Sequence, residues 1–397
     1  MHWKALATIA PTAISAALYL TIHSAFALSM LRRGRRRDDP GEVRAPLPLV
    51  SILKPLAGLD DELVDNLASF AHLDYPRHEI LFGVASPADP AVKAVQAFSK
   101  AHPGVASRLV ITDPGAAQNP KVAQLIELTR QARGSVLVVS DANVRVTPGY
   151  LRSLLGVLLQ PGVGLCSSVI AGTGERSFGA MIENAHLAAG IAPAVVAAAS
   201  IADRPITVGK SMAMRRADLE AVGGWESVGG VLAEDDVLGQ RFNARGYVVA
   251  HCLAPVENRN TTCSLSRTLE RHSRWGKMRR AIAPRCFALE PLLLPAAVAW
   301  LVALIAPSAL ALSAWLSACL LQVLGAFVAL SLLRPGERNL RLAALEPARA
   351  AVVLACWALA YASRRVSWRG NAFHVAVGSE LIPVVDGDAP ALEPPAT

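Results

Sequence analysis

A long apolar stretch at the start of the chain constrains the fold more than any other feature of the sequence. From Ala5 to Leu31 the residues are apolar apart from a few hydroxyls and His23. A helix of this length can cross a hydrocarbon core of about 30 Å. Five of the next six residues, at 32–37, are arginine. Since positive charge beside a span tends to stay in the cytoplasm, we expect the amino terminus outside and the following domain in the cytosol.

A cleaved signal peptide is the alternative for this stretch, but the basic run follows the apolar residues and no clear cleavage pattern is present. Two further apolar tracts lie later in the chain. The tract from Cys286 to Leu333 contains several prolines, which predicts two helices joined near Pro307. The tract from Ala348 to Ala362 is short for a span, and basic residues flank it. We expect this tract at the cytoplasmic interface, with a tilted or re-entrant helix as the alternatives.

The charge of the chain points to lipid and not to nucleic acid. The formal net charge is +8, and 53% of the residues are hydrophobic. The basic residues gather beside the apolar tracts and do not interleave with aromatics along a groove, so anionic headgroups explain them better than a nucleic acid does. The six cysteines show no CxxC spacing, which favours reduced packing residues and no zinc site. We therefore expect an integral membrane protein with its soluble domain on the cytoplasmic face, at the inner membrane if the chain is bacterial.

Between the first and second apolar tracts, strand-like runs alternate with helical patterns. This alternation predicts an α/β fold with a predominantly parallel sheet covered by helices. The expected strands are Leu49–Leu53, Glu79–Val84, Arg108–Thr112, Ser135–Ser140, Gly164–Ser168 and Ile206–Met214. The expected helices are Asp61–Ala71, Pro90–Ala101, Lys121–Ala132 and Pro148–Leu159. An alanine-rich stretch, Phe178–Ile201, also predicts a helix, and core packing is favoured for it over a lid or an acceptor-side helix.

Acidic residues follow two of the expected strands, where open α/β sheets bind their ligands. Asp141 comes directly after Val136–Ser140, and a carboxylate there is well placed to hold Mg²⁺ or Mn²⁺ beside a diphosphate. Asp89 follows another strand, although it could instead cap the helix that begins at Pro90. No P-loop and no G-x-G-x-x-G after a strand is present, which disfavours triphosphate hydrolysis and dinucleotide binding.

A second acidic group precedes a basic and aromatic cluster. Ala233–Asp236 contains three carboxylates, and Arg271-His272-Ser273-Arg274-Trp275 follows it along the chain. A hydroxyl nucleophile needs a base such as Asp235, and a departing diphosphate needs positive charge such as Arg274. The alternatives are favourable charge at a helix dipole and a solvated basic face. His251 and His272 are not expected to act as bases.

Read together, these segments resemble the family-two type of inverting glycosyltransferase and, more narrowly, the ceramide glucosyltransferase family, family 21. The order and spacing of the motifs carry the resemblance over nearly the whole chain. The matching segments are Leu53–Leu56 with Gly58, Leu73–Pro76, Asp89, Asn119-Pro120-Lys121, Asp141, Ala233–Asp235, Arg271-x-x-Arg274-Trp275 and Ser367–Gly370.

The resemblance implies a membrane-anchored GT-A fold, which is Rossmann-like, with a UDP-sugar donor and a lipid alcohol acceptor. On this basis the chain divides into an N-terminal membrane helix at 1–31, a basic linker at 32–47, the GT-A domain at 48–285, membrane and interfacial helices at 286–376, and a disordered tail at 377–397. The expected partners are the donor, the lipid and the membrane, with no nucleic acid.

By the same resemblance, Asp89 binds the uridine, Asp141 approaches the metal ion and the diphosphate, and Asp235 is the general base. Lys121, Arg271, Arg274 and Trp275 complete the donor-binding set. The expected cofactor is a divalent cation, Mg²⁺ or Mn²⁺. Two departures weaken the match: Asn143 stands where an Asp-x-Asp pair has its second acid, and Asp236 stands where the ceramide enzymes often carry an aromatic residue.

Three other functions stay open at this point. A hopanoid could replace ceramide as the acceptor, with N-acetylglucosamine as the sugar. A processive polysaccharide synthase shares the R-x-x-R-W element but needs several spans to form a channel. A lipid-binding scaffold explains the apolar tracts but leaves the acidic strand ends without a use. The sugar itself depends on pocket shape and is not read from a motif.

Overall fold

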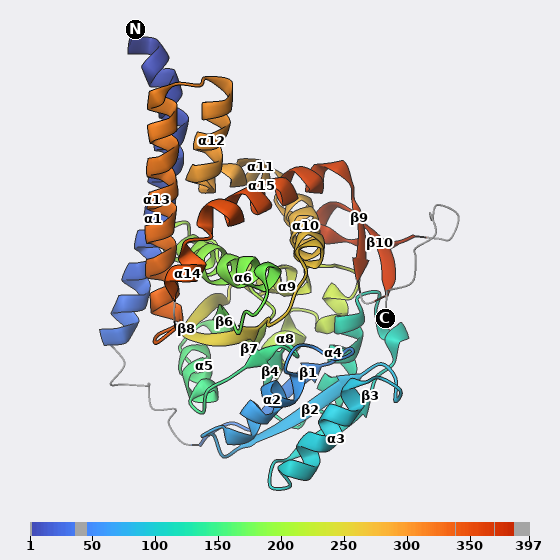
Figure 1. Cartoon of the computed structure of the whole chain (residues 1–397). Helices are drawn as coiled ribbons and strands as arrows, with labels where there is room; N and C mark the ends of the chain where they lie inside the picture. Colours follow the sequence, from blue (N-terminus) through green and yellow to red (C-terminus); the bar gives the residue numbers. More distant parts are fainter. Residues whose placement is uncertain (1, 36–45, 338, 369, 385–397) are drawn as a thin grey trace.

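The computed structural model describes residues 2–35, 46–337, 339–368 and 370–384, with no side-chain detail for 2–8 and Arg35. Most of the expected basic linker and residues 385–397 of the expected tail lie outside these ranges. The described chain forms an α/β domain below a group of long helices that stand away from it (Figure 1). The predicted fold class, α/β with membrane-type helices at both ends, is confirmed.

The domain is built on a mixed sheet of eight strands in the order β3-β2-β1-β4-β7-β6-β8-β5. β3, β2, β1 and β4 run parallel to one another, and β7 is antiparallel to both of its neighbours. The strands are β1 Val50–Pro55, β2 His78–Val84, β3 Ser107–Ile111, β4 Val136–Ser140, β5 Val144–Arg145, β6 Val163–Thr173, β7 Ser211–Arg215 and β8 Val248–Arg259.

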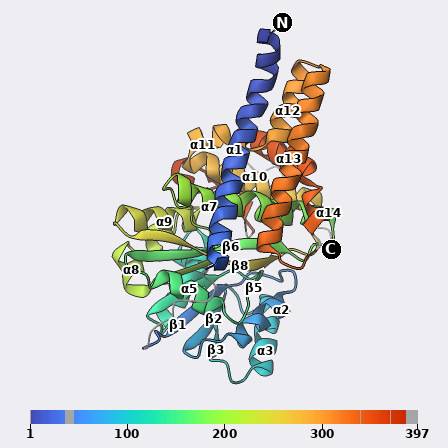
Figure 2. The same ribbon diagram turned by 90° about the vertical axis from the view of Figure 1, so that its left-hand side faces the viewer.

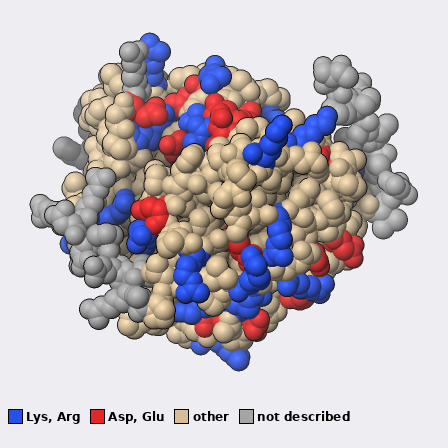
Figure 3. Space-filling view, turned by 90° about the horizontal axis from the view of Figure 1, so that it is seen from below, with Lys and Arg blue, Asp and Glu red and all other residues tan. Residues whose placement is uncertain are grey.

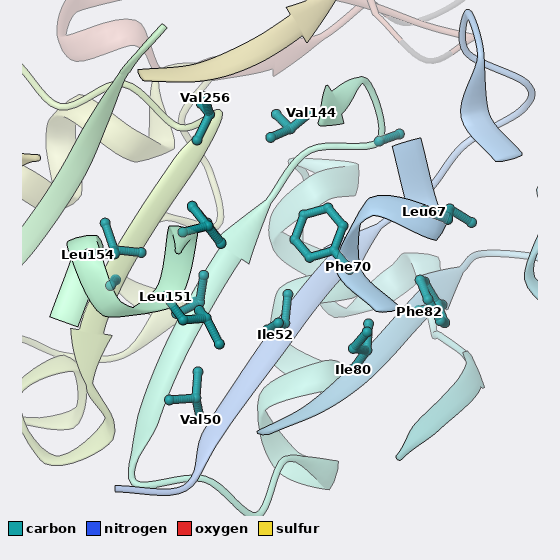
Figure 4. Close-up of a cluster of buried hydrophobic side chains, with 14 of the residues drawn as sticks. Val50, Ile52, Leu67, Phe70, Ile80, Phe82, Val144, Leu151, Leu154 and Val256 are labelled. Carbon is teal, nitrogen blue, oxygen red and sulfur yellow. The ribbon is translucent and has the colours of Figure 1, made fainter. Parts of the chain in front are cut away.

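Helices cover both faces of the sheet because its strands carry apolar residues on both sides. In β1, Ile52 packs into one core with Phe70, Phe82 and Leu151 (Figure 4), whereas Leu53 packs into the core of the opposite face. The covering helices are α2 Leu63–Ala68, continued by the short η1 Ser69–His72, α3 Ala91–Ala101, α4 Pro120–Gln131, α5 Tyr150–Leu158, α8 Arg216–Ala221 and α9 Glu234–Ala244.

The six predicted strands and four predicted helices of the domain are all present, with shifted ends. The predicted strand Ile206–Met214 is wrong at its start, because β7 begins only at Ser211 and residues 206–210 form a loop and turn. β8 was not predicted at all. Its sequence mixes His251 and Glu257 with apolar residues, and much of the strand is only half-buried, so no clear alternation marks it.

Two long helices, α1 His2–Arg35 and α13 Ala309–Leu333, form with the shorter α12 Pro295–Ile305 the part that stands away from the domain (Figures 1 and 2). The segments Ile9–Gly34 and Ala309–Leu333 are long and apolar enough to cross a membrane, with 22% and 33% of their most apolar windows buried. α12 also meets the test when joined to α11 Pro284–Leu289 and η5 Glu290–Leu293, but a bend of 79° separates them. The predicted break near Pro307 is confirmed, since it falls between α12 and α13.

The alanine-rich stretch behaves differently from these helices. It forms α6 Phe178–Ala185, a π-helical turn η3 His186–Ile191 and α7 Ala192–Ile201. It is apolar enough to span a membrane, yet 61% of its window is buried inside the protein. Ala185, Ala188 and Ala192 pack with Phe26 of α1 and Ala326 of α13. The expected core packing is therefore confirmed, and its partners are the two long helices.

The remaining helices lie between the long helices and the sheet. α15 Glu346–Ala362 crosses above the domain beside α10 Leu265–Ile282 (Figure 1), and the short α14 Asn339–Ala343 precedes α15. Among the described residues α15 does not meet the length and hydropathy test for a span. The interfacial position expected for Ala348–Ala362 stays a prediction.

Near the C-terminus the chain forms a small sheet of three strands, where one expectation from the sequence is wrong. Residues 377–383 were expected in a disordered tail, but they form η6 Val377–Ser379 and β11 Leu381–Pro383. β11 pairs with β10 Asn371–Val375, which pairs with β9 Arg365–Trp368. The signal against disorder is apolar burial: Leu381 packs with Phe373, with Val375 and with Leu232 of the main domain.

The end of the molecule far from the long helices carries lysines and arginines interspersed with acidic residues (Figure 3). In this view the basic residues do not form one continuous stripe.

Candidate active site

Lys121 joins two of the acidic motifs at one edge of the sheet. Its ammonium lies 3.0 Å from Asp141 Oδ1, just beyond β4, and 2.9 Å from Glu234 Oε1, at the start of α9. The two carboxylates hold the pKa of Lys121 above its usual value, although burial alone would lower it. The ammonium therefore stays charged and ties the two elements together.

Asn119 explains why Lys121 points into this edge. The Asn119 side chain caps α4 by accepting hydrogen bonds from the backbone N–H groups of Lys121 and Val122. Its amide nitrogen donates to Val231 O at 2.8 Å and to Glu234 Oε2 at 3.3 Å. One buried asparagine thus fixes both the first turn of α4 and the segment that leads into α9.

Asp235, next to Glu234 at the start of α9, is a half-buried residue of this group. Its Oδ2 accepts from Gly209 N at 2.6 Å, and its Oδ1 accepts from Asp236 N at 2.8 Å. Burial, followed by the charge of Glu234, raises the pKa of Asp235 from 3.8 to about 7, while Lys121 acts in the opposite direction. A carboxylate with a pKa near neutrality can take a proton from a hydroxyl and release it again at physiological pH.

Gly209 permits this close approach. A Cβ at this position would lie 2.8 Å from Asp235 Oδ2 and 3.1 Å from Lys121 Nζ. Any other residue would therefore displace the carboxylate or the ammonium. The loop that ends at Gly209 also carries Arg204, whose Nη1 lies 3.4 Å from Cys286 Sγ at the start of the C-terminal apolar segments.

Lys210 occupies the other side of Asp141. Its Nζ lies 3.3 Å from Asp141 Oδ2 and donates to Asn143 Oδ1 at 2.9 Å. The backbone holds the pair together as well, since Asp141 N donates to Lys210 O at 3.1 Å. Lys210 was missed by the sequence analysis because residues 206–210 were assigned to a strand.

A third lysine lies beneath Asp141. Lys54 is fully buried, donates to Asp141 O at 3.0 Å and to Ser140 Oγ at 3.2 Å, and stands 3.9 Å above the Phe70 ring. Burial lowers the pKa of Lys54 to about 7, against the raising effect of Asp141. Lys54 fixes the backbone at the end of β4 and has no exposed surface for a ligand.

Arg271 lines a polar hollow beside this cluster. The hollow is bordered by Asn143, Asp60, Arg259, Arg267 and Arg271. Arg271 pairs with the buried carboxylate of Glu183, and its Nη1 lies 3.4 Å from Asn260 Oδ1. Since Asn143 also contacts Lys210, the hollow adjoins the lysine pair around Asp141.

Arg274 and Trp275 make protein contacts within the same helix region. Arg274 Nη1 donates to Ser367 O of β9 at 3.4 Å, and burial together with the charge of Arg271 lowers its pKa. The Trp275 ring lies 5.1 Å from the ring of His272, which is buried. The Arg274 contact joins α10 to β9, whereas the Trp275 contact lies within α10.

Asp89 makes the expected helix-capping contact, and its role in binding uridine stays a prediction. Its Oδ1 accepts from Ala91 N at 2.8 Å in the first turn of α3 and also from Gly58 N at 3.0 Å after β1. The first contact is the expected helix cap. The second contact joins the ends of β1 and β2, where a parallel sheet presents ligands.

The C-terminal sheet reaches both motifs of the site. Ser379 is fully buried with φ 63°, its carbonyl accepts from Leu232 N at 2.8 Å, and its hydroxyl accepts from Ala233 N at 3.2 Å, one residue before α9. Lys277 Nζ of α10 donates to Arg365 O of β9 at 2.8 Å. The end of the chain therefore braces the segments that carry Asp235 and Arg271.

The structure thus brings Lys121, Asp141 and Asp235 into one cluster and places Arg271 beside it through Asn143. Arg274 and Trp275 point to β9 and His272, and Asp89 stands at a different strand end. Glu234, Lys210 and Glu183 were not predicted. The paired acids of Ala233–Asp236 hinted at Glu234, but no local pattern marks Glu183.

The surroundings of Asp141 do not fit a divalent cation. Its two oxygens contact the ammonium groups of Lys121 and Lys210, and a neutral amide, Asn143, stands two residues on. A metal ion needs several oxygen donors and is repelled by adjacent cations. No group of three His, Cys, Asp or Glu side chains suited to a metal occurs in the described part of the chain. Metal binding at Asp141 stays a prediction that this geometry does not favour.

The family profile and the most similar relatives agree on one family of proteins. The sequence profile of glycosyl transferase family 21 matches residues 9–381. Ceramide glucosyltransferase 3 of Caenorhabditis elegans is 30% identical over 247 residues, which cover 62% of this chain and 54% of that protein. Ceramide glucosyltransferase 1 of the same organism is 27% identical over 277 residues, covering 69% and 58%. The matched part of the chain thus spans little more than half the length of these relatives.

Solved structures give weaker likenesses. A mannosyltransferase from Pyrobaculum calidifontis, in complex with GDP-Man and Mn²⁺, is 20% identical with a TM-score of 0.46, over 87% of this chain and 98% of that one. Glucosyl-3-phosphoglycerate synthase from Mycobacterium tuberculosis, in complex with Mg²⁺ and UDP, is 18% identical with a TM-score of 0.36, over 62% and 78%. Because both TM-scores lie below 0.5, neither likeness bears on the function of this chain.

Proposed function

Because the chain belongs to glycosyl transferase family 21, we propose that it moves a hexose from a UDP-sugar to the primary hydroxyl of a ceramide-type sphingolipid. The observation that carries this proposal is the environment of Asp235. The residue is half-buried, burial raises the pKa of its carboxyl group to about 7, and it lies beside a cluster of lysines and acids at the sheet edge. That combination suits a base next to an anionic leaving group.

In the proposed reaction the acceptor hydroxyl attacks the anomeric carbon from the face opposite the diphosphate. The new bond forms from the acceptor oxygen, the bond to the diphosphate oxygen breaks, and the electron pair leaves with UDP. Asp235 takes the acceptor proton as the bond forms. One base and one displacement invert the anomeric configuration. The hydrogen bonds from Gly209 and Asp236 keep the carboxylate in one orientation for this step.

The donor would lie along the strand ends. Asp89, placed beside Gly58, would bind the uridine part, and Arg271 would approach the diphosphate from the hollow beside Asn143. Lys121 would support the site indirectly, because its ion pairs hold Asp141 and Glu234 in place. Arg274 would position α10 against β9, and Trp275 packs on His272 within the same helix.

The acceptor would come from the lipid side. The loop that ends at Gly209 contacts Cys286 through Arg204, and exposed apolar residues such as Ile201 and Leu289 lie on the helices beside it. This arrangement connects Asp235 with the apolar segments over a short stretch of chain. We propose that the domain faces the cytoplasm, at the inner membrane if the chain is bacterial.

A transfer assay tests the proposal. The full chain purified in detergent is offered ceramide or a hopanoid polyol against a panel of UDP-sugars, and the products are identified by mass spectrometry. Glycosylated ceramide that disappears in Asp235→Asn supports the reaction and the base. Glycosylated hopanoid alone would move the acceptor class, long polymer would indicate a processive synthase, and no product from any pair would favour a lipid-binding scaffold.

A further inference from the structure

Lys210 is the lysine of the Asp141 cluster that is open to a ligand. The side chain of Lys210 is 23% exposed, whereas that of Lys121 is 9% exposed and Lys54 is fully buried. Asp141, with 24% of its side chain exposed, lies at the same surface. A ligand that reaches this edge would therefore meet the ammonium of Lys210 before either of the others.

Lys210 also stands where positive charge is required. A departing diphosphate gains negative charge, and a cation that is already oriented stabilises it. Arg271 borders the adjoining hollow, but its guanidinium is already paired with the buried Glu183. Lys210 contacts Asp141 at 3.3 Å and the neutral Asn143 at 2.9 Å. Among the described residues, its ammonium therefore forms an ion pair with one carboxylate.

The charges around Asp141 do not require a metal ion. A divalent cation held by two carboxylates has no net charge. Here the carboxylate of Asp141 faces two ammonium groups, those of Lys121 and Lys210, and Asn143 carries no charge. Because the amide at position 143 supplies no second negative charge, the lysines already balance the carboxylate.

Lys121 and the backbone keep this arrangement in place. Lys121 binds the other oxygen of Asp141 at 3.0 Å, and Asp141 N donates to Lys210 O at 3.1 Å. Gly209, next to Lys210, donates to Asp235 at 2.6 Å. Lys210, which would bind the leaving group, is thus the next residue along the backbone from the glycine that holds Asp235, the residue that would act as base.

We propose that Lys210 binds the diphosphate of the nucleotide-sugar donor and takes the place of a divalent cation there. The proposal rests on the function proposed above and adds a residue and a metal-independent mode of donor binding to it. Lys210 turns from Asp141 and Asn143 to a diphosphate oxygen and donates a hydrogen bond to it. It keeps its proton throughout, because the acceptor proton goes to Asp235.

The test is UDP binding by the full-length protein in detergent, measured by calorimetry in excess EDTA. The variants are Lys210→Met, which keeps the length without the charge, and Lys210→Arg, which keeps the charge. Lys100→Met is the control, because Lys100 is exposed on α3. Thermal unfolding of each variant shows whether it is folded.

We expect the wild-type protein and Lys100→Met to bind UDP equally well in EDTA. Losing a charge-assisted hydrogen bond should weaken UDP binding to Lys210→Met by about 10- to 100-fold, and Lys210→Arg should retain most of the affinity. The electron paramagnetic resonance signal of free Mn²⁺ should not fall when wild-type protein is added, with or without UDP, beyond the loss that UDP itself causes.

Three outcomes would overturn the proposal. UDP binding by the wild type only after Mn²⁺ or Mg²⁺ is restored would place a metal at this site and leave the proposed function standing. Wild-type affinity in folded Lys210→Met, measured in EDTA, would remove the role of Lys210 alone. Absence of UDP binding with and without a divalent cation would instead contradict the proposed donor, and with it both proposals.

Discussion

Two buried groups of charged residues in this protein differ in a way that separates function from stability. The first, which we name the site cluster, lies at the sheet edge and consists of Lys121, Asp141, Lys210, Glu234 and Asp235. The second, which we name the junction network, joins the long helices to the domain and consists of Tyr19, His186, Gln322, Glu346 and Arg349.

The junction network is closed and internally matched. Arg349 binds both oxygens of Glu346 at 2.7 Å and reaches His186 Nδ1 at 3.1 Å. Gln322 donates to Glu346 at 3.3 Å and accepts from Ala296 N at 2.6 Å. Glu346, Arg349, Gln322 and His186 are all buried. One acid is satisfied by one base and an amide, and no charge faces a space where a substrate could bind.

The site cluster, with three acids and two lysines, opens at the surface. Asp141 and Lys210 are both about a quarter exposed, and the pKa of Asp235 is raised to about 7. Buried charge alone therefore does not identify a site. An acid that is not fully neutralised, beside charges that solvent can reach, is the more specific sign.

Replacing Asp235 should have the largest effect of all, and this effect should fall on activity and not on stability. Asp235→Asn keeps the size of the side chain but removes the base, so turnover should fall by about 10²- to 10⁴-fold. The unfolding temperature should stay within a few degrees of the wild-type value, because no buried charge loses its only partner. Sugar transfer and thermal unfolding are measured on the same preparation, and a variant that loses activity by unfolding would contradict this assignment.

Breaking the junction network should instead lower stability and leave the activity per folded molecule unchanged. Arg349→Met leaves Glu346 buried without its base, at a cost to folding of about 3–5 kcal/mol. The matched double variant, Glu346→Leu with Arg349→Met, removes both charges and should be clearly more stable than the single variant. Thermal unfolding in detergent compares the three proteins, and activity per folded molecule should stay near wild type. Equal losses in the single and double variants would show that the pair is not the source of the stability.

The dependence of the rate and of the stability on pH gives a further test of Asp235. Because the pKa of Asp235 is raised from 3.8 to about 7, the carboxylate is protonated in acid and inactive as a base. We expect kcat/KM to rise about tenfold per pH unit below pH 7 and to level off above it. The same raised pKa favours the folded state below about pH 4 and removes that contribution as the pH rises through 7. A flat rate profile from pH 5 to 8 would contradict the role of Asp235.

Ser379 should give the smallest effect. Removing its hydroxyl in Ser379→Ala leaves Ala233 N without its partner and should cost about 1 kcal/mol of stability. Ser379→Gly removes the same hydroxyl but suits the positive φ of 63°, so it should regain part of that stability. If the hydroxyl positions α9, both variants should lower kcat a few-fold with little change in KM. A wild-type kcat in folded Ser379→Gly, which also lacks the hydroxyl, would contradict a role of the hydroxyl in positioning α9.

The sequence was sufficient for the elements with strong local patterns. Val136–Ser140 reads as a buried strand, and the carboxylate after it is at the site. Residues 206–210 were misassigned because Ile206, Thr207 and Val208 resemble a strand, although Gly209 and Lys210 form a turn against Asp235 and Asp141. That error concealed Lys210 and its contacts with Asp141 and Asn143.

Long-range contacts set the other limit on prediction. Glu183 lies on α6 and pairs with Arg271 on α10, and Ser379 contacts Ala233 from the far end of the chain. Neither pairing has a local signal, because each depends on how α10 and the C-terminal sheet pack on the domain. The family resemblance supplied the motifs, and the tertiary structure showed which of them meet.

The anomeric configuration of the product tests the central claim most directly. The wild-type protein is given an α-linked UDP-hexose and ceramide, and the glycolipid is examined by proton NMR. A direct displacement with Asp235 as the base predicts a product with the inverted, β configuration. A product that retains the α configuration would require a second displacement, and it would contradict the single-base mechanism.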